Sequence, residues 1–159
     1  ELIKAVCSSD ELSQKRVFNI VDLKNRIKSI MIYNEKDNFV EIQKVITRVS
    51  KLANNSDLSR DVLSTKDYVN TKLFEKDCEL KVFEFIGELE KLFSEGYCNY
   101  LELLNLFEIN VNTIENLFDN EKGVLIMSED LKIRNNRLNL LCLIRNYSLK
   151  IADFTLLNS

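Results

Sequence analysis

The stretch that decides the fold is RLNLLCLIRNYSL, residues 137–149, where apolar side chains fill nearly every position from Leu138 to Ile144. A helix that is apolar on almost all sides must be covered by several neighbouring helices. Two architectures provide such cover: the central helix of a stacked helical repeat and the core helix of a compact bundle. The apolar run is far shorter than the ~20 residues that a membrane-spanning helix needs, so we expect no membrane segment.

The remainder of the chain has helical spacing almost throughout, because apolar residues recur every three or four positions along most of its length. The 159 residues include no proline and only three glycines, the residues that most readily break a helix. These features predict an all-α protein in which residues 1–159 form a single helical domain. Because the chain begins at Glu1 rather than Met, we expect it to be an excerpt of a longer chain.

Polar breaks between the apolar stripes predict where seven or eight helices lie. Ahead of the stretch quoted above, helices are predicted over residues 11–33, 39–52, 64–74, 80–93, 99–107 and 112–118, with a short turn at 58–63. Ser128, followed by Glu129 and Asp130, predicts the start of the last long helix, because capping side chains and early acidic residues suit a helix N-terminus. That helix is predicted to run to about residue 148, and a further helix to begin within 151–157.

Two of these helices show a weak internal repeat, at an offset of 40 residues. The apolar positions of one align with those of the other, pairing Val45, Ile46, Val49 and Leu52 with Phe85, Ile86, Leu89 and Leu92. A period of roughly 40 residues is typical of helical solenoids. The stretch at 140–149 falls at no clean multiple of this period, so a compact α-helical bundle stays open beside an armadillo-like superhelix.

The residue types needed for common catalytic sites are missing. The chain has no histidine, which excludes Ser-His-Asp and Cys-His arrangements and a histidine general base. Its three glycines are isolated, which excludes a phosphate-binding loop or a dinucleotide motif. The four cysteines (Cys7, Cys78, Cys98 and Cys142) lack the paired spacing of zinc ligands. We therefore predict no enzyme, no catalytic residue, no metal, no cofactor and no small-molecule substrate.

The net charge of −3 is spread unevenly along the chain. Residues 75–121 hold twelve acidic residues against three lysines, whereas the segments on either side are each mildly basic. The acidic middle suits either ordinary solvated helix faces or a surface that binds a basic partner, and Glu84 with Glu88, one helical turn apart, are candidate contacts. The overall balance lacks the basic stripe of a DNA-binding domain, and the few basic residues of the last helix suit a solvated face, so direct nucleic-acid binding is not expected.

Residues 137–149 resemble the third helix of an armadillo-type repeat, in which an apolar run is followed by Arg-Asn and an apolar-Ser ending. They are most similar to the armadillo-type region of the ARID-bearing subunits of SWI/SNF chromatin remodellers, although Tyr147 stands where leucine is usual. The resemblance implies that Asn146 takes the place of the asparagine on the concave face of the repeat, with Arg145 beside it. These two residues, together with Arg137 on the same helix, are candidate partner-binding residues.

Two functions are therefore expected, from different classes. The first is a non-enzymatic helical-repeat scaffold that binds other protein subunits within a larger assembly, for which the resemblance implies a chromatin-remodelling complex. This protein would be intracellular, with the nucleus favoured over the cytoplasm. The alternative is a compact α-helical viral modulator that binds an amphipathic host helix in a groove, in the manner of Bcl-2.

Overall fold

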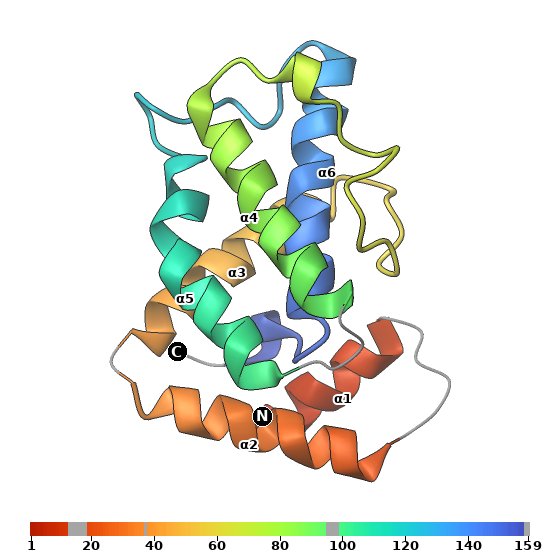
Figure 1. Ribbon diagram of the computed structural model, residues 1–159, viewed down its shortest axis with the longest axis vertical. Coiled ribbons are helices and arrows are strands. Elements are labelled where there is room, and N and C mark those ends of the chain that lie inside the picture. The colour runs from red at the N-terminus through yellow and green to blue at the C-terminus, as the bar shows by residue number, and fades with distance from the viewer. Residues whose placement is uncertain (13–18, 37, 95–98, 158–159) are drawn as a thin grey trace.

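The apolar stretch at 137–149 makes up most of α6 (Leu131–Ser148), and the computed structural model of the protein packs α6 against both α3 (Phe39–Ala53) and α4 (Asp77–Ser94) (Figure 1). The structure describes residues 1–12, 19–36, 38–94 and 99–157. Every residue from Leu140 to Leu149 is buried. The expectation that this helix is covered on all sides is therefore confirmed.

The remaining elements surround this centre. In chain order they are α1 (Leu2–Leu12), α2 (Ile20–Asn34), the short 3₁₀ helix η1 (Thr71–Leu73), α5 (Tyr100–Asn116) and a second 3₁₀ helix, η2 (Phe154–Leu156). In Figure 1, α4 and α5 lie side by side and α3 passes behind them, while α1 and α2 lie at one end of the molecule, near both termini. The segment after α6 returns to this end, where η2 packs on α1 and α3 and the Asp153 N–H donates to the Ala5 carbonyl at 2.9 Å.

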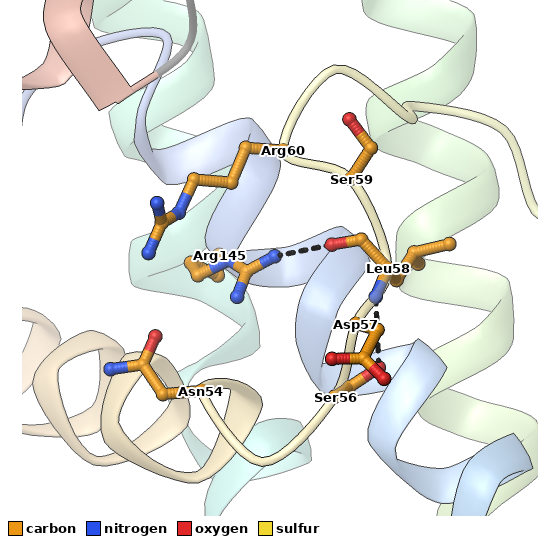
Figure 2. Close-up of a pocket in the computed structure, with 7 residues that line it drawn as sticks. All are labelled: Asn54, Ser56, Asp57, Leu58, Ser59, Arg60 and Arg145. Atoms are coloured by element: carbon orange, nitrogen blue, oxygen red, sulfur yellow. Dashed lines mark hydrogen bonds between the residues drawn. The ribbon is translucent and has the colours of Figure 1, made fainter.

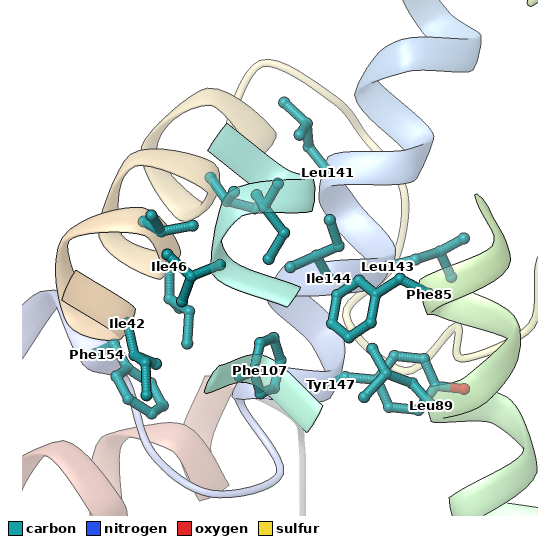
Figure 3. Packing of buried hydrophobic residues seen from close by; sticks show 14 of the residues in the cluster. Ile42, Ile46, Phe85, Leu89, Phe107, Leu141, Leu143, Ile144, Tyr147 and Phe154 are labelled. Atoms are coloured by element: carbon teal, nitrogen blue, oxygen red, sulfur yellow. The ribbon is translucent and has the colours of Figure 1, made fainter. Parts of the chain in front are cut away.

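The core gathers large apolar side chains from several helices at one place (Figure 3). Phe85 of α4 meets Phe107 of α5 edge to face, with ring centroids 5.7 Å apart, which is a favourable geometry for two aromatic rings. Side chains from α3 and α6, among them Ile46 and Ile144, fill the space beside this pair. Burial of such side chains stabilises a fold by roughly 1.5–3 kcal/mol each, so this cluster is the main source of stability.

The described residues form an all-α protein without strands, which confirms the predicted fold class. Their arrangement fits the compact bundle, and the armadillo-like superhelix is not confirmed, because α6 packs against α3, α4 and η1, which come from separate parts of the chain. No helix in the described part of the chain is long and apolar enough to cross a membrane.

Two predicted helix boundaries near the N-terminus are wrong. The helix expected over 11–33 is divided between α1 and α2, and residues 13–18 of it lie outside the described residues. The side chain of Asn19 accepts the N–H groups of Val21 and Asp22, which caps the start of α2 and gives that helix its own beginning.

The predicted break within residues 99–118 is also wrong, since α5 is continuous from Tyr100 to Asn116. The Asn110 side chain donates to the Leu106 carbonyl at 3.0 Å, one turn back, so this asparagine is accommodated inside the helix. Phe107, Val111 and Ile114 keep one face of the helix buried across the expected break.

The largest error concerns residues 54–76, where a helix was predicted over 64–74. Apart from η1 this segment is irregular, and Asp67 has a φ of 68°, in the left-handed region. Its apolar residues do reach the core, because Leu58, Val62 and Val69 are partly buried against it. The apolar spacing therefore predicted correctly that these residues contact the core, but it did not predict the local backbone conformation.

Candidate functional site

Asparagine side chains of α6 hold the irregular segment 54–76 in place. Asn136 forms a two-way pair with the backbone of Asn70, accepting its N–H at 2.7 Å and donating to its carbonyl at 3.1 Å. Asn139 donates to the Tyr68 carbonyl at 2.7 Å. These side chains replace hydrogen bonds that a helix would have supplied to the backbone of this segment.

Asn146, a predicted partner-binding residue, belongs to the same set of contacts. It is fully buried, and its amide donates to the carbonyls of Ser59 at 2.9 Å and Val62 at 2.7 Å. Its amide is thus satisfied within the chain. The spacing of Asn136, Asn139 and Asn146 along one stripe of α6 is the sequence signal for this arrangement.

Arg137, a second predicted site residue, forms a buried ion pair. Its Nε donates to Glu79 Oε1 at 2.9 Å, and its Nη2 to Glu75 Oε2 at 2.6 Å. Burial alone would lower the pKa of Arg137, but the two carboxylates raise it above its ordinary value. Glu79 is completely buried and also accepts the N–H groups of Glu75 and Lys76 at the start of α4. The pair therefore links the starts of α4 and α6.

Glu84 and Glu88, the remaining acidic candidates, are exposed on α4. They lie one turn apart on the outside of the helix, and Glu88 lines a shallow groove with Lys91 and with Glu102 of α5. Nothing in the described part of the chain neutralises Glu84 or Glu88 with an ion pair. No three potential metal-ligating side chains converge among the described residues, and Cys98 lies outside them.

Arg145 lines a pocket at the C-terminal end of α3 (Figure 2). The pocket has a volume of about 290 Å³ and is lined by Asn54, Ser56, Asp57, Leu58, Ser59, Arg60 and Arg145. Arg145 is only 4% exposed and donates to the carbonyls of Ala53 at 3.3 Å and Leu58 at 3.2 Å. Burial lowers the pKa of Arg145, and the positive charge of Arg60 lowers it further.

A row of exposed cations on α3 leads toward this pocket. Lys44, Arg48 and Lys51 are spaced four and three residues apart, so they share one helix face, which we call the α3 basic face. The Arg48 guanidinium lies 4.2 Å from the centre of the Phe118 ring, a cation–π contact that orients it. The face borders a groove of about 340 Å³ that also includes Thr155 and Leu157.

The α3 basic face was not among the predicted sites, although its signal is present in the sequence. Residues 42–56 contain Lys44, Arg48 and Lys51 and no acidic residue. The amphipathic pattern of this helix predicts its buried side. The charges on its exposed side were counted only as part of the net charge of the chain. The chemical capability of the α3 basic face is to bind anions, because three like charges within one helix face attract phosphate or carboxylate groups.

Comparison with known proteins overturns several expectations. No protein family model matches the chain. The chain is similar to bacterial glycine–tRNA ligase beta subunits: it is 29% identical to that of Gloeothece citriformis and 30% identical to that of Picosynechococcus sp., each over 97% of the chain, and 31% identical to that of Persephonella marina over 98%. These alignments cover 22%, 22% and 20% of the relatives, so the chain spans about a fifth of their length.

The resemblance to chromatin-remodelling subunits is therefore wrong, as are the scaffold and viral-modulator functions built on the helical pattern. The expected nuclear location is wrong because the relatives are bacterial proteins. The prediction that the protein is not an enzyme is wrong as well, because the relatives are subunits of a ligase. The expectation of a multi-subunit setting is met in part, since each relative is named as a beta subunit. Over nearly its whole length, the chain is similar to one region of this tRNA ligase subunit.

Proposed function

We propose that this chain is a helical region of a glycine–tRNA ligase beta subunit and that it binds the tRNA substrate through the α3 basic face. The observation that carries the proposal is the position of Lys44, Arg48 and Lys51, three exposed cations on one face with no acidic residue between residues 42 and 56. Phosphate groups dominate the affinity of proteins for nucleic acids, and lysine and arginine are the residues that neutralise them.

The dimensions of the α3 basic face suit a short length of nucleic-acid backbone. A helix rises 1.5 Å per residue, so the seven steps from Lys44 to Lys51 span about 10 Å. A strand that rises ~3.4 Å per nucleotide presents about three phosphates over that distance. Three cations and three phosphates therefore match in number. Because Arg48 is already oriented by the Phe118 ring, less side-chain entropy is lost when it meets a phosphate.

The negative net charge does not oppose this function. Most of the excess acid lies within residues 75–121, which include α4 and α5, whereas α3 lies outside that segment. Within α3 itself, Glu41 stands against Lys44, Arg48 and Lys51, so the charge of this helix is positive. The expectation against direct nucleic-acid binding rested on the charge of the whole chain, and the local charge of α3 favours the opposite conclusion.

The test neutralises the α3 basic face in the complete protein that carries this chain, as Lys44→Gln/Arg48→Gln/Lys51→Gln. All three side chains are exposed, so the fold is retained. We expect tRNA affinity to fall by at least about tenfold, because contacts to three phosphates are lost. The matched control changes three exposed lysines outside α3, as Lys66→Gln/Lys72→Gln/Lys122→Gln. Equal losses in both triple variants, or no loss in the first, would contradict the proposal.

A second surface is proposed for a protein partner. Glu84 and Glu88 are exposed on α4 and lack ion-pair partners among the described residues, so they are available to a basic surface of another subunit of the enzyme. The variant Glu84→Lys/Glu88→Lys should weaken subunit association without altering the melting temperature of the isolated subunit. Unchanged association, measured by analytical ultracentrifugation, would reject these two residues as partner contacts.

A further inference from the structure

We propose that the pocket shown in Figure 2, here called the arginine pocket, binds a single phosphate group between Arg145 and Arg60. The two guanidinium groups come from segments far apart in the sequence, since Arg145 belongs to α6 and Arg60 to the irregular segment 54–76. Figure 2 shows both side chains, with the Asn54 amide, bordering one hollow.

Arg145 is a buried cation without a buried counter-ion. No carboxylate of the described residues lies within ion-pair distance of its guanidinium, although Asp57 also lines the pocket. Its partners are the carbonyls of Ala53 and Leu58 and the Asn146 side-chain oxygen, which accepts from Nε at 3.1 Å and from Nη2 at 3.0 Å. Charged groups that are removed from water are stabilised most by an opposite charge, so an anion is the complement that this environment lacks.

The hydrogen bonds of Arg145 leave a donor for a ligand. A guanidinium has five N–H groups, and those of Nε and Nη2 are all engaged by oxygens of the chain. Nη1 donates only to the Ala53 carbonyl among the described residues, so its second N–H is available at the pocket. Arginine N–H groups form short, charge-assisted hydrogen bonds with phosphate oxygens.

Arg60 adds a second charge that a bound anion would neutralise. It is partly buried and contributes no hydrogen bond or ion pair to the described fold. Its charge nevertheless acts on Arg145, whose pKa is lowered mainly by burial, with a smaller contribution in the same direction from Arg60. Two like charges at one pocket repel each other. An anion between them removes that repulsion while it gains attraction to both.

The other lining groups suit an oxyanion. Asn54 supplies an amide and Ser56 and Ser59 supply hydroxyl groups, all of which can donate to phosphate oxygens. Asp57 is the single carboxylate of the lining, and Figure 2 shows it beside Ser56 rather than between the two arginines. The volume of about 290 Å³ holds a phosphate group together with some of its hydration water.

The arginine pocket stands apart from the α3 basic face, and its inference does not depend on the RNA proposal. Asn54 follows Lys51 by one turn, so a phosphate bound in the pocket could belong to the same RNA backbone. A free oxyanion would satisfy the same groups. The chemistry common to both is a phosphate group, and the experiment separates the two sources.

The test titrates the complete protein with inorganic phosphate by calorimetry, against chloride at equal ionic strength. The decisive variant is Arg60→Gln, because the Arg60 side chain forms no hydrogen bond or ion pair with the other described residues and is partly exposed. We expect Arg60→Gln to weaken phosphate binding by at least about tenfold, the scale of one charge-assisted hydrogen bond. The matched control, Arg134→Gln on the first turns of α6, should leave phosphate binding unchanged.

The source of the phosphate follows from tRNA binding by the same variants. A parallel loss of tRNA affinity in Arg60→Gln assigns the pocket to the RNA backbone, and a loss of phosphate binding alone assigns it to a free oxyanion. The variant Lys44→Gln/Arg48→Gln/Lys51→Gln should keep phosphate binding, which separates this inference from the function proposed above. Equal phosphate binding by wild type and Arg60→Gln, or none by wild type, would overturn the inference.

Discussion

At the scale of single residues, polar side chains of α6 hold the irregular segment 54–76 in its position beside the core. The apolar positions of the helix pack against α3 and α4. Asn136 and Asn146 bind backbone groups of the segment ahead of α4, and Arg137 binds the Glu79 carboxylate within α4. Arginine and asparagine within an apolar helix therefore have a structural purpose here. The resemblance to a repeat family had led us to expect them on a partner-binding face.

The Arg137–Glu79 pair provides a direct test of this purpose. Changing Arg137→Met leaves the Glu79 carboxylate completely buried without its counter-ion, which should lower the free energy of unfolding by about 3–5 kcal/mol. Urea denaturation measures this loss. The double variant Arg137→Met/Glu79→Gln should recover part of it, because the uncompensated charge is gone. A loss below about 1 kcal/mol in the single variant would show that Glu79 finds water or another partner.

Two glycines offer a matched comparison. A Cβ at Gly123, in the turn after α5, would lie 2.4 Å from the Asp119 carbonyl oxygen, so Gly123→Ala should destabilise the fold by about 1–3 kcal/mol. A Cβ at Gly87, within α4, would meet nothing within 4 Å. Gly87→Ala should stabilise by about 0.5–1 kcal/mol, because alanine loses less backbone freedom in a helix. Thermal unfolding compares the two, and the same sign for both would contradict the described turn.

At the scale of elements, predictability depended on where each segment finds its hydrogen-bond partners. α3, α4 and α6 were predicted to within a few residues, because a helix satisfies its own backbone and its apolar stripe reveals its buried face. Residues 54–76 could not be predicted in this way, since their carbonyls bind side chains of α6 that lie over 60 positions later. Such partners leave no local pattern.

The two parts of the candidate site differ in the same way in how far they could be predicted from the sequence. The α3 basic face lies within one helix, and its charge pattern could have been read directly from residues 42–56. The arginine pocket could not, because Arg60 and Arg145 are brought together only by the contacts between segment 54–76 and α6. Arg145 was singled out from the sequence, but for a role on a concave repeat face rather than at a pocket.

Loss of the Asn146 contacts should loosen this segment selectively. The change Asn146→Ala removes the donor from the part-buried hydrogen bonds to the Ser59 and Val62 carbonyls, at a cost of about 1–3 kcal/mol for each group that stays unsatisfied. Hydrogen exchange should accelerate across residues 58–65 and remain slow in the central turns of α4. Uniform acceleration through the whole molecule would mean that segment 54–76 does not open separately from the core.

At the scale of the whole molecule, charge is distributed unevenly along the chain, so the net charge did not predict the charge of the α3 basic face. The chain as a whole carries −3, yet residues 75–121 hold twelve acidic residues against three lysines. The α3 basic face lies outside that segment and faces solvent. An anionic polymer responds to the local field of the surface that it touches, within about a Debye length, rather than to the total charge.

The measurement that tests the central claim most directly is the salt dependence of tRNA binding by the complete protein. A plot of log affinity against log salt concentration has a negative slope, and its magnitude decreases by about 0.7–0.9 for each phosphate contact removed. We expect Lys44→Gln/Arg48→Gln/Lys51→Gln to make the slope shallower by about 2–3 and Lys66→Gln/Lys72→Gln/Lys122→Gln to leave it unchanged. An unchanged slope in the first variant would contradict the assignment of the α3 basic face to tRNA.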